Sequence, residues 1–531
     1  MFFVSLQGMI PERLRKLEPF VFFLCLLAGT LPVVALRYYP TLDGPAHEYN
    51  ARLIAHLLKG DAPLLKTYFE FTRGAVPNWT GHIFLLFFNL FLPAFLAEKA
   101  ILLCYVIGLP LAYRFLLISM KPGNLFLSYL IFPFIYSYFF LMGFYNFNLA
   151  LVFLFLSAAC WIKASTSTGK KPYLLLFFLL ACTYFSHIFV FFILIMGIGL
   201  YELPDLFKKD KTLPIQKRLR KLIPLFLLAG PFLLLALSYL LGHSRGVNIF
   251  LSFHELLTYI THLSPLISFS FTDQLTSSRN ILYVLTVLTV LAIFLRLRSF
   301  FLSRTNQAVK ETFFNRSDSW LALFLILLGL YFLFPDSDGN AGFVSMRLCL
   351  LLLLALLTWV SVQKFPEWII VPAVGFVLFV FNSQIHFHYW KARELNPIVQ
   401  ECHDAGLKLE PNSLVMPLDY SGHWLMSHFA NYLGHEKAVV ILENYEASTD
   451  YFPLVFNWKE FRRPLIGNDS LKGCISYSHE LKTKPKQVDY IFVWGQSEDK
   501  KDSCNIRTDA LIKQFYTLVY KGEWVVLYKL N

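Results

Sequence analysis

Residues 20–48 read FVFFLCLLAGTLPVVALRYYPTLDGPAHE, an apolar run followed within seven residues by a polar cluster. The apolar part, residues 20–36, is long enough to cross the hydrocarbon core of a bilayer as a helix. Basic residues precede it at 13–16, as in a signal peptide, but residues 35–37 form a poor cleavage site. We therefore expect a retained first span, with Asp43 and His47 placed where the chain leaves the bilayer.

Composition extends this prediction to the whole chain. Its 531 residues are 56% hydrophobic, 17% aromatic and only 15% charged, whereas soluble domains carry about 25% charged residues. The apolar residues come in long blocks, such as 173–200, 222–241 and 348–362. These features predict an α-helical polytopic membrane protein.

The basic residues predict the orientation. The net charge of +12 would suggest a nucleic-acid partner in a soluble protein. Here the lysines and arginines gather in three short connections between apolar blocks, residues 163–171, 208–221 and 296–310. This pattern marks cytoplasmic loops, so we predict a cytoplasmic N-terminus and no nucleic-acid partner.

Counting crossings from these loops places the tail. Residues 172–202 must cross an even number of times, which suits two short helices with an outer turn near Ser186 and His187. Five further spans are predicted at 222–241, 280–295, 319–334, 348–362 and 367–382. Residues 82–142 contain three apolar runs, but the chain must cross the membrane an even number of times there for residue 143 to lie outside. One of the runs is therefore short, re-entrant or wrongly divided. We expect about 11 to 13 membrane segments and an external tail.

The tail has a different composition and predicts a separate domain. Residues 385–531 contain turns, charges and alternating runs that indicate a mixed α/β fold. Strands are expected at 413–416, 438–442, 490–494 and 524–528, and helices at 397–405 and 423–433. The predicted domains are a membrane domain, 1–384, with an external first loop at 37–81, and an extracytoplasmic α/β domain, 385–531.

The first loop contains an amphipathic pattern at 44–58. Asp43 is expected to be the N-cap residue of this helix, and the polar side would carry His47, Glu48 and Arg52 along the outer membrane interface. One interpretation is structural, with Asp43 capping the helix and Glu48 pairing with Arg52. The other is chemical, since a carboxylate there could bind a divalent cation or act as a base toward a hydroxyl group.

The order of these features resembles the C-type (GT-C) superfamily of membrane glycosyltransferases, and uncharacterised bacterial members most. The resemblance rests on Asp43, on His47 four residues later, and on a helix that ends in Lys59-Gly60, within a topology that matches over residues 1–350. It implies a GT-C-like fold in which Asp43 acts as the base or a metal ligand and His47 assists. Some relatives carry an adjacent Asp-Glu pair at this place. Glu48 matches the glutamate of that pair in residue type, although it is not adjacent to Asp43.

The resemblance also implies the reaction and its partners. A sugar would be moved from a polyprenyl-phosphate donor to a lipid, glycan or protein acceptor, with inversion, on the outer face of the membrane. A divalent cation, Mg²⁺ or Mn²⁺, would be the cofactor. The setting would be the bacterial inner membrane, with the site on the periplasmic side.

Other polar residues near the outer face are candidate substrate-binding residues. Asn146 lies near the start of a span that begins outside, where relatives often carry a second acid or polar residue, and His187 lies at the proposed outer turn. Either could instead be structural, with Asn146 satisfying a helix end and His187 packed and hydrogen-bonded. Arg347 begins a span far from the cytoplasmic basic loops, and its guanidinium suits the donor phosphate. It could instead snorkel or pair with Asp336 or Asp338.

The loop at 243–278 is long enough to cover a cavity. It supplies two more candidate substrate-binding residues, Arg245 and His254, of which Arg245 is a second phosphate candidate.

Two other function classes stay open at this point. A lipid or polysaccharide transporter or flippase is disfavoured, because the chain lacks paired Gly/Pro-broken spans in two matching halves. A non-catalytic scaffold for envelope assembly is compatible with the missing second acid. The sequence therefore predicts a glycosyltransferase, with these two as alternatives.

Overall fold

A computed structural model describes residues 12–74, 76–120, 125–165, 169–207, 216, 220–242, 246–305, 315–339, 342–460, 464–470, 486–495 and 503–531. The chain forms two compact units. Unit 1 comprises Met1–Pro32, Leu103–Phe140 and Phe147–His388, and unit 2 comprises Val33–Leu102, Leu141–Asn146 and Tyr389–Asn531. Each is described by itself.

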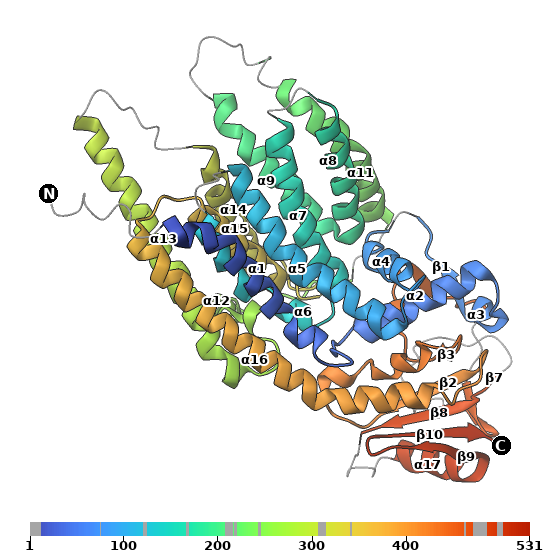
Figure 1. Cartoon of the computed structure of the whole chain (residues 1–531). Helices are drawn as coiled ribbons and strands as arrows, with labels where there is room; N and C mark the ends of the chain where they lie inside the picture. The colour runs from blue at the N-terminus through green and yellow to red at the C-terminus, as the bar shows by residue number, and fades with distance from the viewer. Residues whose placement is uncertain are drawn as a thin grey trace. The chain divides into compact units, whose positions relative to one another are not determined.

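Long apolar helices dominate the chain, as its composition predicts (Figure 1). Within the described residues, eight helices are long and apolar enough to cross a membrane. They are α1 (Glu12–Val34), α5 (Ala94–Met120), α7 (Tyr145–Ala164), α11 (Ile223–Gly242), α13 (Phe271–Thr305), α14 (Ser319–Leu333) with the preceding turn η4 (Arg316–Asp318), α15 (Val344–Ser361) and α16 (Glu367–Gly406).

Burial separates the central helices of unit 1 from its peripheral ones. The apolar windows of α7 and α15 are each 83% buried, whereas those of α11 and α13 are each 22% buried. Leucine and phenylalanine side chains therefore remain exposed along α11 and α13, which is stable only in an apolar solvent such as lipid. This confirms the prediction of a polytopic helical membrane protein.

Shorter apolar helices accompany these spans and resolve the region that the sequence left ambiguous. Helices α8 (Lys171–Ser186) and α9 (Ile188–Phe207) are separated at His187, as predicted. Of the three runs predicted within 82–142, only α5 has the length of a span. The first contains the nine-residue α4 (Thr80–Phe88), and the third contains a 3₁₀ helix, η1 (Leu125–Phe134), and the one-turn α6 (Tyr138–Leu141).

Helix α16 differs from its prediction in length. We expected a span at 367–382 and a separate helix at 397–405, but one helix runs through both, from Glu367 to Gly406. The polar residues after 382 favour water without breaking a helix. The predicted domain boundary after residue 384 therefore falls inside α16, close to the division between the two units at His388.

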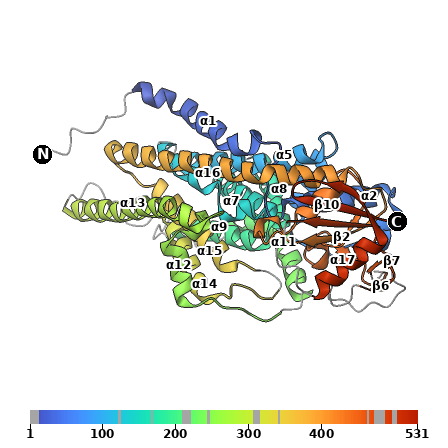
Figure 2. The ribbon, with the colours of Figure 1, turned by 90° about the horizontal axis from the view of Figure 1, so that it is seen from below.

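Unit 2 is built on a five-stranded mixed sheet in the order β3-β2-β8-β10-β9. Its strands are β2 (Leu414–Asp419), β3 (Val440–Ile441), β8 (Tyr490–Trp494), β9 (Tyr516–Lys521) and β10 (Val525–Leu530). The four predicted strands are confirmed, and β9 was missed. Helix α17 (Ser503–Phe515) lies against this sheet (Figure 2), so the tail has the predicted mixed α/β fold.

Residues 423–433 are not the α-helix that the sequence indicated. They form two short 3₁₀ helices, η5 (Trp424–Met426) and η6 (Phe429–Gly434). Local side-chain bonds explain the interruption. The Ser427 hydroxyl donates to the Trp424 carbonyl at 2.8 Å, and the Asn431 amide donates to the His428 carbonyl at 3.2 Å. Such bonds compete with the regular helical pattern.

The first loop belongs to the same unit as the tail. Strand β1 (Phe69–Phe71) pairs antiparallel with β4 (Leu454–Phe456), with Phe69 opposite Phe456. The remaining elements described in the chain are α2 (Gly44–Lys59), α3 (Pro63–Tyr68), α12 (Phe253–Thr261), β5 (Pro464–Ile466), β6 (Asp469–Ser470), β7 (Lys486–Gln487), and the short 3₁₀ turns η2 (Arg220–Leu222), η3 (Ser264–Leu266) and η7 (Glu446–Ser448). The β1–β4 pair brings the polar first loop against tail residues.

Candidate functional site

Asp43 occupies the predicted N-cap position of α2, but its carboxylate makes no capping hydrogen bond. Instead, the Gly44 N–H donates to the Thr41 hydroxyl at 3.2 Å. The helix ends at Gly60, whose φ of 74° suits a glycine C-cap. The Asp43 carboxylate is therefore available for other partners.

Most of the polar side of α2 is buried by other parts of the chain. His47 is 3% exposed and Glu48 is fully buried. Glu446 of the tail contacts His47, and Asn89, just after α4, donates to Glu48, as buried polar groups require partners. The placement of α2 along the outer membrane interface stays a prediction.

Helix α2 is held to the tail by complementary polar contacts. The side-chain amides of Asn50 and Asn444 donate to each other's oxygens at 3.0 and 2.9 Å. The Tyr49 hydroxyl donates to the Val439 carbonyl at 2.8 Å and accepts from the Ile441 N–H at 3.0 Å. These bonds fix the chain just before Glu446 against α2.

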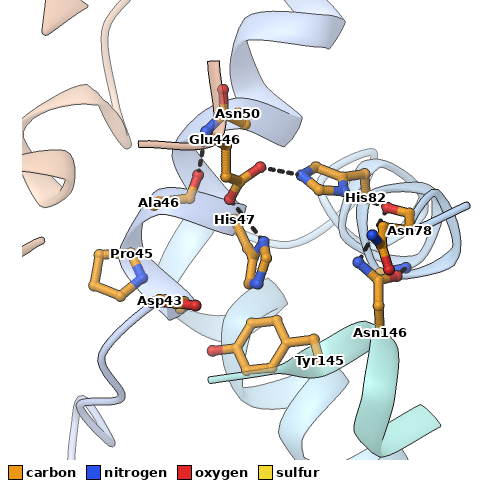
Figure 3. Close-up of polar contacts among 12 residues, drawn as sticks. Asp43, Pro45, Ala46, His47, Asn50, Asn78, His82, Tyr145, Asn146 and Glu446 are labelled. Carbon is orange, nitrogen blue, oxygen red and sulfur yellow. Dashed lines mark hydrogen bonds and ion pairs between the residues drawn. The ribbon is translucent and has the colours of Figure 1, made fainter. Parts of the chain in front are cut away.

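Glu446, the first residue of η7, lies between two histidines of the first loop (Figure 3). Its Oε1 atom is 2.7 Å from Nδ1 of His47, and its Oε2 atom is 2.7 Å from Nε2 of His82. All three side chains are buried. A single carboxylate therefore joins α2, α4 and the tail.

Asn146 fixes the segment that presents His82. Its side-chain oxygen accepts from the Gly81 N–H at 2.6 Å, and its amide donates to the Asn78 carbonyl at 3.0 Å (Figure 3). The same carbonyl lies 3.3 Å from Nδ1 of His82. Asn78 has a φ of 68°, a conformation that asparagine tolerates better than most residues. Asn146 therefore helps to fix the position of His82, and its role in substrate binding stays a prediction.

A second group of polar residues surrounds Asp43. Its Oδ1 atom lies 3.8 Å from Nε2 of His428, whose Nδ1 atom is 2.8 Å from Oε1 of Glu443. The Asn431 amide donates to Oε2 of Glu443 at 2.7 Å. The ring of Tyr445 stacks on His428 with a centroid separation of 4.6 Å. Glu443 and Tyr445 therefore orient His428 toward Asp43.

The electrostatics of this group favour proton transfer at Asp43. Burial raises the pKa of Asp43 above its usual range, although His428 and His47 lower it in part. Burial opposes the charge of His428, but the carboxylates of Glu443 and Asp43 raise its pKa to about 9. Near neutral pH, a cationic imidazole thus faces a carboxylate whose pKa has moved toward the working range of a general base.

The Glu446 carboxylate is held in its ionised form. Burial alone would raise its pKa, but His47 and His82 lower it to about 2. The pKa of His47 is raised, since Glu446 and Asp43 outweigh the effect of burial.

Beneath α2, close backbone packing sets the position of Asp43. The Asp43 N–H donates to the Met142 carbonyl at 3.0 Å. Gly143 has a φ of 73°, and a Cβ atom there would lie 2.7 Å from the Gly44 nitrogen. The Tyr145 hydroxyl donates to Glu98 at 3.0 Å, which adds a buried carboxylate to the floor of the site.

Glu48 points to a different environment from Asp43 and His47. Its Oε1 atom accepts from the Asn89 amide at 2.8 Å, and the Asn89 side-chain oxygen lies 3.4 Å from Nη1 of Arg52. Asn89 thus stands between the two residues that the sequence suggested as a helical ion pair. The catalytic role of Glu48 stays a prediction.

Two predicted substrate-binding residues, His187 and Arg347, contact the same aromatic side chain in unit 1. Phe147 contacts both of them, with its ring 5.2 Å from that of His187 and 5.7 Å from the Arg347 guanidinium carbon. Nη1 of Arg347 donates to the Gly342 carbonyl at 2.9 Å. The Asp336 carboxylate accepts from the Ser345 N–H at 2.9 Å.

The two candidates from the 243–278 loop contribute less. His254 is an exposed residue of α12, and Arg245 lies outside the described residues. The binding roles proposed for both stay predictions.

The metal-ligand set of the described residues differs from the predicted one. His47, His82 and Glu446 bring one ligand atom each to within 4.8 Å of one another, and Asp43 is not among them. Binding of Mg²⁺ or Mn²⁺ at Asp43 stays a prediction. Mg²⁺ favours a shell of oxygen ligands, whereas the charged groups that lower the pKa of Asp43 are the imidazoles of His428 and His47.

Sequence reasoning missed five residues of the site: His82, Glu98, His428, Glu443 and Glu446. Glu98 had a signal, because it is an acid between two apolar runs, and such residues are often functional. His82 and Glu446 are separated by 364 positions, so no local pattern could connect them.

Comparison with known proteins gives structural likenesses but no sequence match. No protein-family model matches the chain. No curated protein matches it in sequence. The fold is similar to the crystal structure of ArnT from Cupriavidus metallidurans in the apo state, with 10% sequence identity, a TM-score of 0.38, and coverage of 97% of this chain and 98% of that chain. At this TM-score, the likeness assigns no residue of the site.

Proposed function

We propose that this protein is an integral-membrane glycosyltransferase that moves a sugar from a polyprenyl-phosphate donor to an acceptor hydroxyl on the outer face of the membrane. The observation that carries the proposal is the environment of Asp43. The residue is buried, and its carboxylate makes no cap bond and faces His428, which Glu443 orients. This arrangement suits a general base better than a helix cap.

In the proposed reaction, Asp43 accepts the proton of the acceptor hydroxyl. The acceptor oxygen forms a bond to the anomeric carbon of the donor sugar from the face opposite the phosphate. The bond between that carbon and the phosphate oxygen breaks, and its electron pair leaves with the polyprenyl phosphate. One displacement of this kind inverts the anomeric centre.

His428 has a positioning role in this scheme. Its positive charge keeps Asp43 ionised before the acceptor binds, and Glu443 fixes its ring. The side chain of His428 is 17% exposed and that of Glu443 is 27% exposed, compared with 9% for Asp43. The acceptor would therefore approach Asp43 from the side of these two residues.

The membrane helices support a lipid-borne donor. The eight candidate spans within the described residues indicate a chain in a bilayer, where a polyprenyl phosphate is dissolved. The predicted phosphate ligand is Arg347, whose planar guanidinium can bind a phosphate group with two hydrogen bonds.

A transfer assay tests the proposal. Purified protein in detergent is incubated with a mixed pool of polyprenyl-phosphate sugars and with lipid, glycan and peptide acceptors, and products are identified by mass spectrometry. The proposal expects one donor to be consumed and a product of inverted anomeric configuration. Specific donor binding without any transfer would overturn it and favour a transporter or a scaffold.

A further inference from the structure

The proton transfer proposed above assigns no step to the cluster of His47, His82 and Glu446 as a whole. Its three side chains come from α2, α4 and η7, and all are buried. A carboxylate between two imidazoles can form a purely structural hydrogen-bond network, or the three side chains can be metal ligands. The geometry of the individual atoms distinguishes these two interpretations.

One half of the cluster is not a well-formed hydrogen bond. Nδ1 of His47 and Oε1 of Glu446 approach to 2.7 Å. Neither atom, however, has a hydrogen-bond partner of acceptable geometry among the described residues. The two atoms form a close ion pair without an aligned hydrogen bond, and burying polar atoms without well-aligned hydrogen bonds costs free energy. A shared cation would satisfy both at once.

The donor types select the class of cation. Two imidazole nitrogens and one carboxylate oxygen form a set that suits Zn²⁺, with a fourth position left for water or another ligand. Mg²⁺ and Ca²⁺ prefer shells of oxygen atoms. In a tetrahedral zinc site with bonds of about 2.0 to 2.2 Å, neighbouring ligand atoms lie about 3.3 Å apart. The contacts of Glu446 with the two histidines, both 2.7 Å and each to a different carboxylate oxygen, would need to open by a few tenths of an ångström. The three ligand atoms lie within 4.8 Å of one another, so any pair farther apart than about 3.3 Å would need to close on the ion.

Residues around the cluster provide the outer support that metal sites have. A metal-bound histidine usually donates its second ring N–H to a carbonyl or carboxylate group. His82 faces Glu446 with Nε2 and the Asn78 carbonyl with Nδ1, 3.3 Å away. Asn146 holds that carbonyl from its other side at 3.0 Å. The reciprocal Asn50–Asn444 pair fixes the segment that carries Glu446.

We propose that His47, His82 and Glu446 bind a zinc-class divalent transition-metal ion. The ion ties the first loop to the tail, and it holds the start of α2, where Asp43 lies. This site is distinct from the predicted Mg²⁺ or Mn²⁺ site at Asp43. It does not depend on the identity of any sugar donor, so it can hold or fail independently of the proposed reaction.

Metal content of the wild-type protein tests the proposal directly. The full chain, with any affinity tag removed, is purified in detergent, stripped with a chelator and reloaded with Zn²⁺ or Co²⁺. Bound metal is measured by mass spectrometry, and Co²⁺ coordination by visible absorption. We expect one equivalent per chain, the intense bands of four-coordinate Co²⁺, and no displacement by excess Mg²⁺. A folded wild-type protein that retains no Zn²⁺ or Co²⁺ would overturn the proposal.

Variants then locate the ion. We expect His82→Ala and Glu446→Gln to lose the bound equivalent, and His82→Cys to keep it and add a sulfur-to-cobalt charge-transfer band. The matched control is His56→Ala, because His56 lies on α2 and pairs with Asp61 outside the cluster. Loss of metal in the His56 variant to the same extent, or retention in both cluster variants, would show adventitious binding and contradict the assignment. If His82→Ala does not fold, the metal content of wild-type protein and the charge-transfer band of His82→Cys still test whether the cluster binds the ion.

Discussion

The Nε2 atom of His428 lies 3.8 Å from Oδ1 of Asp43, although the two residues are 385 positions apart in the chain. The contact connects the first loop to the tail through a charge pair. It also changes what Asp43 is available to do, because the carboxylate faces an imidazole and makes no cap bond to its own helix. The predictions below follow from this relationship and from its neighbours.

The first prediction concerns the pH dependence of transfer. Asp43 must be ionised to act as a base, and burial raises its pKa, so kcat/KM should rise with pH along an acid limb. The measurement is kcat/KM against pH, and we expect an acid limb that leads to a plateau.

Removing the charge of His428 should move the acid limb in a defined direction. In His428→Gln the cation beside Asp43 is lost, so the limb should shift upward by about 1 to 3 pH units. The control is His56→Gln, which should keep the wild-type profile. An acid limb that stays in place in the His428 variant would show that His428 does not act on Asp43.

The second prediction concerns stability. The pKa of His428 is raised from 6.5 to about 9 on folding. Its contribution to the free energy of unfolding is therefore fully present below about pH 6.5 and is lost as pH rises toward 9. We expect the Tm of wild-type protein to fall across this window by more than the Tm of His428→Gln.

Glu443 supplies the largest of the effects that raise this pKa. In Glu443→Gln the pKa of folded His428 should be lower, so the pH range over which Tm falls should end below pH 9. In Glu443→Asp, which keeps the carboxylate, this pH range should be partly restored. A Tm profile identical to wild type in Glu443→Gln would contradict the proposed orientation of His428.

The third prediction tests the connection between α2 and the tail. In Asn50→Ala the Asn444 side chain stays buried without its partner, which should cost about 1 to 3 kcal/mol of unfolding free energy. The double variant with Asn444→Ala should lose less than the sum of the two single changes, because both unsatisfied groups are then gone. Thermal unfolding in detergent measures all three, and strict additivity would argue against the reciprocal bond.

The fourth prediction concerns the donor. If Arg347 binds the donor phosphate with its planar fork, Arg347→Lys should raise the KM for donor more than it lowers kcat, since lysine keeps the charge but not the bidentate geometry. Arg393, which lies over the Trp390 ring, provides a matched control as Arg393→Lys. Equal KM values in the two variants would remove Arg347 from donor binding.

The parts of the fold that sequence reasoning predicted correctly are those with a local cause. The break at His187 between α8 and α9 follows from two basic loops and an even number of crossings. Strands β2, β8 and β10 follow from short runs of β-branched and aromatic residues bounded by turns. Residues 423–433 failed because Ser427 and Asn431 form local side-chain bonds, which an apolar pattern does not reveal.

In the candidate site, too, only residues with a local sequence signal could be predicted. Asp43 and His47 were found because they follow the first span at a recognisable spacing. His428, Glu443 and Glu446 could not be found, because they meet the first loop only through the folding of the tail. The same contacts explain why Glu48 and His47, neighbours in sequence, end in different environments: one faces Asn89 and the other faces Glu446.

The most direct test of the central claim is the transfer rate of Asp43→Asn, with Asp61→Asn as the control. Asp61 also lies in the first loop but is exposed and pairs with His56. We predict that Asp43→Asn stays folded and loses transfer by a factor on the order of 10² to 10⁴, the range expected for a general base, while Asp61→Asn keeps the wild-type rate. A folded Asp43→Asn protein with the wild-type rate would contradict the account.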